Sequence, residues 1–337
     1  MSEYFTTIPD ENLRPLINAE QLFASYAQAR DAAKKYSGNM SWQAGPTGTR
    51  YLVSAKMTNG IRQKKSFGAE SSKTRMIFER YQTEQSDAKL RSLALEQSYA
   101  RQVRMNRALG LGSAPPIIVK VLKELDLASL TKKVLVIGTN SIFAYASAAR
   151  VMVSEDIAAT DDLDLLWDSR SRMKLVSPDP QGLLGIIKKA DSSFVKMEGQ
   201  GYTITNDRGY QVDLIKRNEG FQSNEEPYQI WENDADFWAT KTNNMDWLLS
   251  SPRFSRPVMA TNGEMAMMHT VDPRAFVLFK YWLSERPERD PGKAIRDKLQ
   301  AKAIQDLVEQ WLPNLPFPEM VSFPISVRDR VAASKQS

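Results

Sequence analysis

Residues 162–165 read Asp-Leu-Asp-Leu, inside the stretch ATDDLDLLWD. Successive side chains of a β-strand point to opposite faces, so this alternation predicts a strand with both carboxylates on one face and both leucines in the core. Two carboxylates this close repel, and each raises the proton affinity of the other unless a cation lies between them. The pattern therefore predicts a buried sheet with a site for a divalent cation at Asp162 and Asp164.

A third carboxylate, Asp213, is the one acid in the apolar run YQVDLIK, which reads as another strand. If the two strands are neighbours, the three acids converge on one point that can hold one or two hard metal ions. Asp-rich clusters are also typical of turns and solvated strand ends, and we interpret Asp161 and Asp168, which flank the apolar run, in that way. The functional interpretation thus depends on Asp162 and Asp164 together with Asp213.

A glycine turn precedes these strands. In KKVLVIGTNSIFAYASAAR, an apolar strand at residues 134–137 leads directly into Gly138, then small polar residues, then an alanine-rich helix. Backbone N–H groups at such a turn, together with the start of a helix, can hold a phosphate. The turn is neither a P-loop nor a dinucleotide fingerprint, because Gly-Lys-Ser/Thr and GxGxxG are both absent. Alone it is equally typical of a helix cap, and the Asp-x-Asp strand that follows makes it more specific.

The composition limits the possible chemistry. The 337-residue chain has no cysteine and a single histidine, His269, which excludes thiolate nucleophiles, disulfides, most zinc sites and most histidine-dependent triads. Any metal site must then use oxygen ligands, which suit Mg²⁺ or Mn²⁺. The net charge of +5 is compatible with a nucleotide or nucleic-acid partner, although many unrelated proteins are equally basic.

The length and the residue patterns predict three regions. Residues 1–113 form a helical region with a β-hairpin at about residues 42–68, joined at an Asn-Gly turn. Residues 114–270 form the sheet core, in which residues 218–262 read as an irregular excursion or an insertion. Residues 271–337 are helical again, with Asp272 capping the first helix. Helices are expected near 71–109, 117–127, 179–190, 273–286 and 293–312, and strands near 134–137, 162–167, 193–198, 201–207 and 209–217.

No apolar run is long enough for a membrane helix, and the first residues lack the features of a signal peptide. We therefore expect a cytoplasmic protein without a membrane partner. The methionine-rich GEMAMMHT is expected to fill a strand or the core, with His269 in a structural role.

The order of Gly-Thr-Asn-Ser at the head of a helix, an Asp-x-Asp strand and a later strand aspartate resembles the DNA polymerase β-like nucleotidyltransferase superfamily. The chain is also similar to a bacterial branch of nucleotidyltransferase-fold proteins, through RYLV, KKSFG, GLGSAPP, DPRAFVLFKYWLSER and KAIRDKLQA. This similarity runs from about Trp42 to Leu312. Two positions depart mildly from the pattern: Thr139 stands where glycine or serine is commoner, and Ser141 where alanine or leucine is.

The resemblance implies an α+β fold: a polymerase β-like nucleotidyltransferase core, built as a mixed sheet with packed helices, flanked by the N-terminal hairpin and helical region and by C-terminal helices. It implies that Asp162, Asp164 and Asp213 are the catalytic residues and bind the Mg²⁺ or Mn²⁺ that carries a nucleoside triphosphate. It also implies nucleotide-binding roles for Gly138, Thr139, Ser141 and Lys280. Arg286 and Arg296 are weaker candidates, and a solvated surface lysine is the alternative interpretation of Lys280.

The activity that this resemblance implies is transfer of a nucleoside monophosphate from an NTP to a hydroxyl group, with release of pyrophosphate. The acceptor is open: an RNA or tRNA end, or a protein side chain. The hairpin and basic helix at residues 50–107 are compatible with nucleic acid but also with a solvated face. The alternatives are a non-catalytic nucleic-acid-binding or toxin–antitoxin partner protein that retains the fold, and an enzyme that makes a nucleotide signal.

Overall fold

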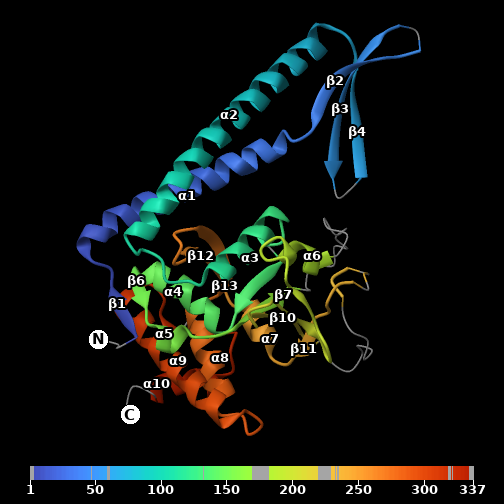
Figure 1. Cartoon of the computed structure of the whole chain (residues 1–337). Coiled ribbons are helices and arrows are strands. Elements are labelled where there is room, and N and C mark those ends of the chain that lie inside the picture. Colours follow the sequence, from blue (N-terminus) through green and yellow to red (C-terminus); the bar gives the residue numbers. More distant parts are fainter. Residues whose placement is uncertain are drawn as a thin grey trace. The chain divides into compact units, whose positions relative to one another are not determined.

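The chain divides into two compact units in the computed structural model (Figure 1). The main unit consists of Met1–Asp10 and Gly110–Ser337, and the N-terminal unit consists of Glu11–Leu109. The C-terminal helices therefore belong to the same compact unit as the sheet core. The structure describes residues 4–46, 48–58, 61–131, 133–168, 182–218, 229–231, 233, 235–317, 320 and 322–333.

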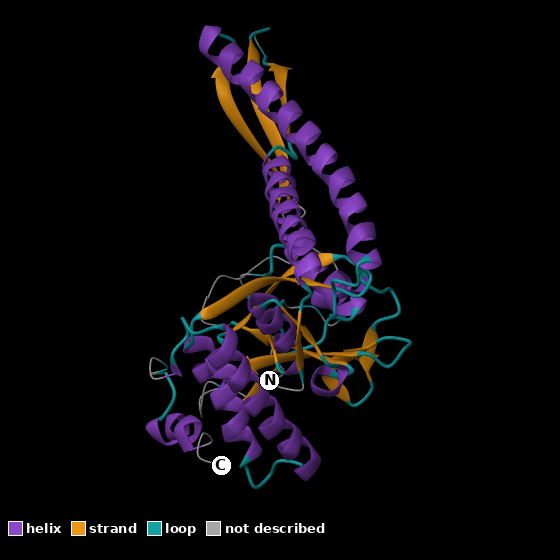
Figure 2. Cartoon of the chain, turned by 90° about the vertical axis from the view of Figure 1, so that its left-hand side faces the viewer, coloured by secondary structure: helices purple, strands orange, loops and turns teal. Residues whose placement is uncertain are grey.

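The N-terminal unit contains two long helices and a small antiparallel sheet, which Figure 2 shows beside the helices. The predicted hairpin is present as β3 (Arg50–Thr58) and β4 (Ile61–Ala69), and its Asn-Gly turn lies outside the described residues. A third strand, β2 (Asn39–Ala44), pairs with β3 and was not predicted, because NMSWQA has too few apolar residues to stand out from a loop. The helices are α1 (Asp10–Lys35) and α2 (Ser72–Ala108).

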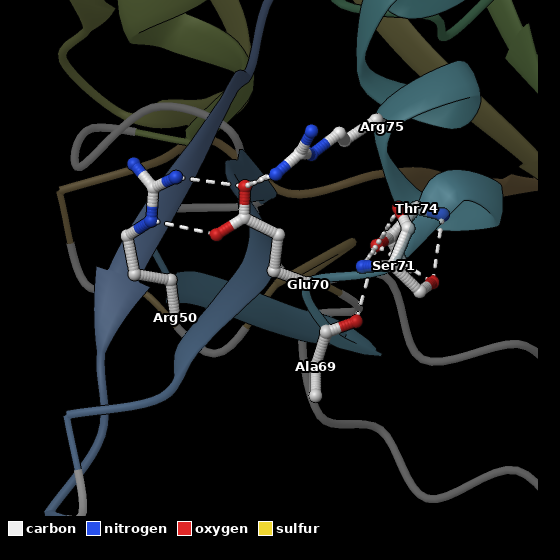
Figure 3. Close-up of polar contacts among 6 residues, drawn as sticks. All are labelled: Arg50, Ala69, Glu70, Ser71, Thr74 and Arg75. Atoms are coloured by element: carbon white, nitrogen blue, oxygen red, sulfur yellow. Dashed lines mark hydrogen bonds and ion pairs between the residues drawn. The ribbon is translucent and has the colours of Figure 1, made fainter.

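Local contacts explain where these helices begin and how they meet. Ser71 caps α2: its hydroxyl accepts from the Thr74 amide at 3.3 Å, and its own amide donates to the Thr74 hydroxyl at 2.8 Å (Figure 3). The two helices contact each other through aromatic rings, with Tyr99 stacked on Tyr26 at 4.9 Å and tilted against Phe23 at 5.9 Å. The buried apolar side chains of this unit are few, so these ring contacts carry much of its packing.

The main unit is built on a mixed eight-stranded sheet in the order β12-β13-β5-β7-β10-β9-β8, with β11 beside β10. Three pairs are parallel, namely β13–β5, β7–β10 and β10–β11, and the others are antiparallel. Such a mixed sheet with packed helices is the α+β class expected from the sequence. The strands are β5 (Val134–Ile137), β7 (Asp162–Trp167), β8 (Val195–Met197), β9 (Gln200–Thr205), β10 (Gln211–Arg217), β11 (Thr240–Thr242), β12 (Arg253–Met259) and β13 (Met265–Val271).

Two parts of the main unit differ from the sequence-based expectation. The segment expected to be irregular, residues 218–262, contains α7 (Met245–Ser250) and the seven-residue edge strand β12. Pro257 weakens the strand signal of β12, and an edge strand tolerates proline because one side needs no partner. The N-terminal strand β1 (Phe5–Thr7) was also missed; it pairs with β6 (Val151–Val153) far along the chain.

Helices of the main unit pack against the sheet and against one another (Figure 1). Helix α3 contacts β13 and α6, whereas α4 contacts β12, β6 and α9, and α8 contacts α7, α9 and α10. Asp272 caps α8 as predicted, accepting from the Arg274 amide at 2.9 Å. The helices are α3 (Pro116–Leu127), the 3₁₀ turn η1 (Thr139–Ser141), α4 (Ile142–Ala149), α5 (Glu155–Ala158), α6 (Gly182–Lys188), α7, α8 (Pro273–Ser284), α9 (Pro291–Trp311) and α10 (Ile325–Ala333).

The core confirms the alternation that was read from the sequence. Leu163 and Leu165 are fully buried, whereas Asp162 and Asp164, on the other face of β7, keep partial access to solvent. The methionine-rich segment is strand β13 with Met265 and Met268 in the core, as expected. Among the residues described, no helix is both long and apolar enough to cross a bilayer.

Candidate active site

Strand register brings the three predicted acids to one face of the sheet. Strands β7 and β10 are parallel, and Asp213 lies directly opposite Asp164. Alternate residues of a strand share a face, so Asp162 lies on that same face. On the other side of β7, the antiparallel strand β5 places Ile137 opposite Asp164, which puts the glycine turn beside the same carboxylate.

Gly138 is required at this turn for two reasons. Its backbone has φ 68° and ψ −159°, a conformation that only glycine adopts without strain. A Cβ atom on Gly138 would also lie 2.3 Å from Oδ2 of Asp164. The close approach of backbone and carboxylate therefore depends on the missing side chain.

The residues after Gly138 connect the turn to other parts of the main unit. The Thr139 hydroxyl accepts a hydrogen bond from Nε2 of Gln300 on α9, at 3.2 Å. Ser141 is fully buried; its hydroxyl donates to the Val136 carbonyl at 3.3 Å and is 2.8 Å from the Thr270 hydroxyl. The structure therefore places the Ser141 side chain in the core, where it anchors the turn to β5 and β13.

Asn140 and Tyr210 are two buried residues next to the acids that sequence reasoning did not single out. Nδ2 of Asn140 donates to the main-chain carbonyl of Asp162 at 2.6 Å, which fixes the start of β7 to the turn. Burial, followed by the negative charge of Asp162, raises the pKa of the Tyr210 hydroxyl above its ordinary range. The neighbouring Asn140 side chain lowers the pKa of Tyr210 and partly offsets this rise.

The environment of the acids disfavours their ionised forms. Burial, with smaller contributions from Asp162 and Asp213, raises the pKa of Asp164 to about 7, while Lys280 and Arg289 act in the opposite direction. Burial also raises the pKa of Asp213, partly offset by a 2.6 Å hydrogen bond from the Thr203 hydroxyl. The negative charge at this face is thus incompletely compensated.

The acids fit a hard divalent cation by their chemistry and by their shared face. Their donor atoms are all oxygens, and a cation would relieve the repulsion that raises their pKa values. Within the described parts of the chain, however, no three acidic or histidine residues already stand in a metal-binding arrangement. The Thr160 hydroxyl donates to Asp162 and the Thr203 hydroxyl to Asp213, so these carboxylates have protein partners of their own.

Basic side chains of α8, of the turn after it and of the start of α9 act on the acids through their charge. Lys280 is buried, and its Nζ atom lies 2.6 Å from Oδ1 of Asp297, whose Oδ2 lies 2.7 Å from Nη2 of Arg289. Lys280 and Arg289 both lower the pKa of Asp164, and Lys293 lowers that of Asp213. Three cations, one from α8, one from the turn between α8 and α9 and one from the first turn of α9, thus lower the pKa values of these acids.

The remaining predicted residues lie at the edge of this arrangement or outside it. A cavity of about 610 Å³ borders Asp161, Asp162 and Arg296, and the Arg296 guanidinium donates to the Ala159 carbonyl. Arg286 instead lies over the Trp282 ring at 5.1 Å and pairs with a glutamate of its own turn. Asp168 directly follows β7, as a strand-end residue would, but it is not solvated: it is buried in a 2.6 Å ion pair with Arg253.

A family model described as nucleotidyltransferase matches residues 117–323, more than half of the chain. The chain belongs to the nucleotidyltransferase family. No curated protein and no solved structure gives a match to the sequence. The matched range contains the acids, the glycine turn and helices α8 and α9 of this nucleotidyltransferase, whereas the N-terminal unit lies outside it.

The buried ion pair between Lys280 and Asp297 of this nucleotidyltransferase leads to a prediction about its stability. Asp297→Asn should destabilise the protein by about 3 kcal/mol, because it leaves Lys280 buried without its counter-ion. Urea unfolding measures the change. The matched control is Asp306→Asn, which removes an exposed ion pair with Lys302 and should cost less than about 0.5 kcal/mol. Equal losses in the two variants would contradict a special role for Asp297.

Proposed function

We propose that this nucleotidyltransferase is a polymerase β-like, metal-dependent enzyme that transfers a nucleoside monophosphate from an NTP to a hydroxyl acceptor. The observation that carries the proposal is the register that puts Asp164 between Asp213 and Gly138, with Asp162 on the same face. Paired carboxylates beside a phosphate-sized turn suit a substrate that arrives as a metal–triphosphate complex.

The acids would hold the cofactor. Asp162, Asp164 and Asp213 would bind Mg²⁺ or Mn²⁺, and such an ion, when bound, neutralises charge on the phosphates and lowers the pKa of the attacking hydroxyl. Asp213, which accepts a hydrogen bond from Thr203, would take the proton of the acceptor hydroxyl. The acceptor oxygen then bonds to the α-phosphorus, and the bond from that phosphorus to pyrophosphate breaks.

The glycine turn and three basic side chains of the α8–α9 region would hold the phosphates. Gly138 and Thr139 start the helical turn that faces the acids, and their backbone is suited to a phosphate oxygen. Lys280, Arg289 and Lys293 supply positive charge on the same side, where the leaving pyrophosphate gains negative charge. Because Asp297 holds both Lys280 and Arg289, it would act as a positioning residue for this charge.

A second candidate is a non-catalytic nucleic-acid-binding or partner protein that retains the fold. The hydroxyl groups that already engage Asp162 and Asp213 favour it, since a ready-made metal site would leave those oxygens accessible. The two candidates differ in whether the acids are needed for turnover. Synthesis of a nucleotide signal is the same chemistry with a nucleotide as acceptor.

The test is transfer of label from the α-phosphate of each common NTP. The protein is incubated with Mg²⁺ and a cell extract, and the products are separated into RNA, protein and small nucleotides. We expect Mg²⁺-dependent transfer that a chelator abolishes and that the Asp162→Ala/Asp164→Ala variant lacks. Absence of transfer, or equal transfer by this variant, would favour the non-catalytic candidate; the product class identifies the acceptor.

A further inference from the structure

The positive charge of the chain is concentrated in the N-terminal unit. Glu11–Leu109 contains 17 lysines and arginines against 8 acids, a net charge of +9. The remaining residues contain 28 lysines and arginines against 32 acids, a net charge of −4. The moderate charge of +5 for the whole chain therefore conceals a strongly basic unit attached to an acidic one.

Within the N-terminal unit, the sheet is the part without acids. No aspartate or glutamate occurs between Asp31 and Glu70, a segment that includes β2, β3 and β4. The same segment has seven basic residues: Lys34, Lys35, Arg50, Lys56, Arg62, Lys64 and Lys65. A sheet with this composition has a positive potential that nothing within it offsets.

One face of this sheet is covered by α2 and the other is exposed. Trp42 meets Phe78 of α2 with ring centroids 5.8 Å apart, and Leu52, which pairs with Trp42, is fully buried. Paired residues of antiparallel strands share a face, so the residues that alternate with these lie on the opposite side. We call that side the open face; it includes Ser41, Gln43, Tyr51, Met57, Arg62 and Lys64.

The lysine and arginine side chains of the open face differ in their ion pairing from the arginines at its border. Arg50 and Arg75 both form an ion pair with Glu70, at 2.7 Å and 3.0 Å, so part of their charge is offset (Figure 3). Arg62 and Lys64 are exposed, and no acid of the described chain forms an ion pair with either. Tyr51 beside them is 37% exposed. The open face thus combines accessible cations with an accessible aromatic ring.

We propose that the open face binds the phosphate backbone of a nucleic acid, and that this nucleic acid is the acceptor in the transfer. Accessible lysine and arginine side chains bind phosphates, while an aromatic ring on a sheet stacks on a base. Ser41 and Gln43 add neutral hydrogen-bonding groups to the same face. An acidic protein surface would also bind the cations, but it would not account for the exposed aromatic ring beside them. Only the assignment as acceptor rests on the proposed function.

The test is fluorescence anisotropy of the full-length protein with labelled single-stranded RNA and DNA of about 20 nucleotides. The Arg62→Glu/Lys64→Glu variant should bind at least about tenfold more weakly than the wild type. The slope of log affinity against log salt should fall by about 1.4, since each lost phosphate contact to a single strand contributes about 0.7. Tyr51→Ala should weaken binding about fivefold and leave the salt slope unchanged.

The matched control is Arg91→Glu/Arg104→Glu, which makes the same change of charge at two exposed positions of α2. It should change affinity less than about threefold. The inference is overturned if both double variants lose affinity equally, if neither probe binds below about 100 μM, or if labelled polyglutamate binds as well as RNA or DNA.

The same variants separate this inference from the proposed function. Binding of Mg²⁺–NTP and the thermal midpoint should be unchanged in Arg62→Glu/Lys64→Glu, because the substitutions lie outside the site of the main unit. If the open face binds nucleic acid but no nucleotide is transferred, the proposed function is wrong and the proposed binding surface is retained. If nucleotide is transferred to protein and no nucleic acid is bound, the proposed function is retained and the proposed binding surface is wrong.

Discussion

Asp164→Asn should abolish nucleotidyl transfer while the protein stays folded and, at about pH 8, becomes more stable than the wild type. Asn keeps the shape of the side chain but removes the charge that a metal ligand needs, so we expect transfer to fall by about 10³-fold or more. Stability rises because ionised Asp164 is disfavoured by burial and by the neighbouring acids Asp162 and Asp213. The transfer assay and a thermal melt measure the two effects on the same preparation.

The stabilisation by Asp164→Asn should depend on pH in a defined direction. The pKa of Asp164 is about 7 in the folded protein, whereas an unfolded aspartate has a pKa of about 3.9. The folded state therefore binds the proton more tightly, and the wild type loses stability as pH rises from about 4 to about 7. The advantage of the variant should be largest above about pH 7 and should disappear near pH 4.

The control for this experiment is Asp161→Asn. Asp161 is exposed and lies one residue before β7, so it differs from Asp164 in burial and in face while sharing its chemistry. We expect transfer within about twofold of the wild type and a change in the free energy of unfolding of no more than about 0.5 kcal/mol. Full activity in Asp164→Asn would show that this carboxylate is not a metal ligand, and a large loss of stability would show that its charge is compensated in the folded state.

The local parts of this site were predictable from the sequence, because they depend on the alternation of apolar and acidic residues along a strand and on a glycine turn. The alternation at residues 162–165 determines which side chains face the core, whatever the strand pairs with. Asp272 as a helix cap and the strand that ends at Gly138 follow from neighbouring residues alone. No such rule gives the register between β7 and β10, so the pairing of Asp213 with Asp164 needed the structure.

The electrostatic parts of the site were predicted least well, because they depend on how helices pack. Lys280 was singled out by resemblance, but the effect of Arg289 and Lys293 on the pKa values of the acids depends on how α8 and α9 pack in the main unit. Their one local signal is a position just before, or in the first turn of, a helix capped by Asp290. The partners Asp297 and Gln300 are likewise brought to the site by tertiary packing.

Gly138→Ala should damage both stability and activity, and the damage to activity should be out of proportion to the damage to stability. The left-handed backbone at Gly138 costs a residue with a Cβ atom about 1–3 kcal/mol. The new methyl group would also lie 2.3 Å from Oδ2 of Asp164 if nothing moved, so the carboxylate must rotate or the strand must shift. Because a carboxylate displaced by about 1 Å can cost about 100-fold in rate, we expect transfer to fall by at least that factor.

Gly199→Ala separates the backbone effect from the collision with the carboxylate. Gly199 also has a positive φ, of 76°, but a Cβ atom there would meet nothing within 4 Å. It should lose about 1–3 kcal/mol in urea unfolding and keep transfer within about twofold. If Gly138→Ala loses no more activity than Gly199→Ala at equal stability, the carboxylate does not depend on the glycine, and the approach of β5 to Asp164 would be a feature of packing alone.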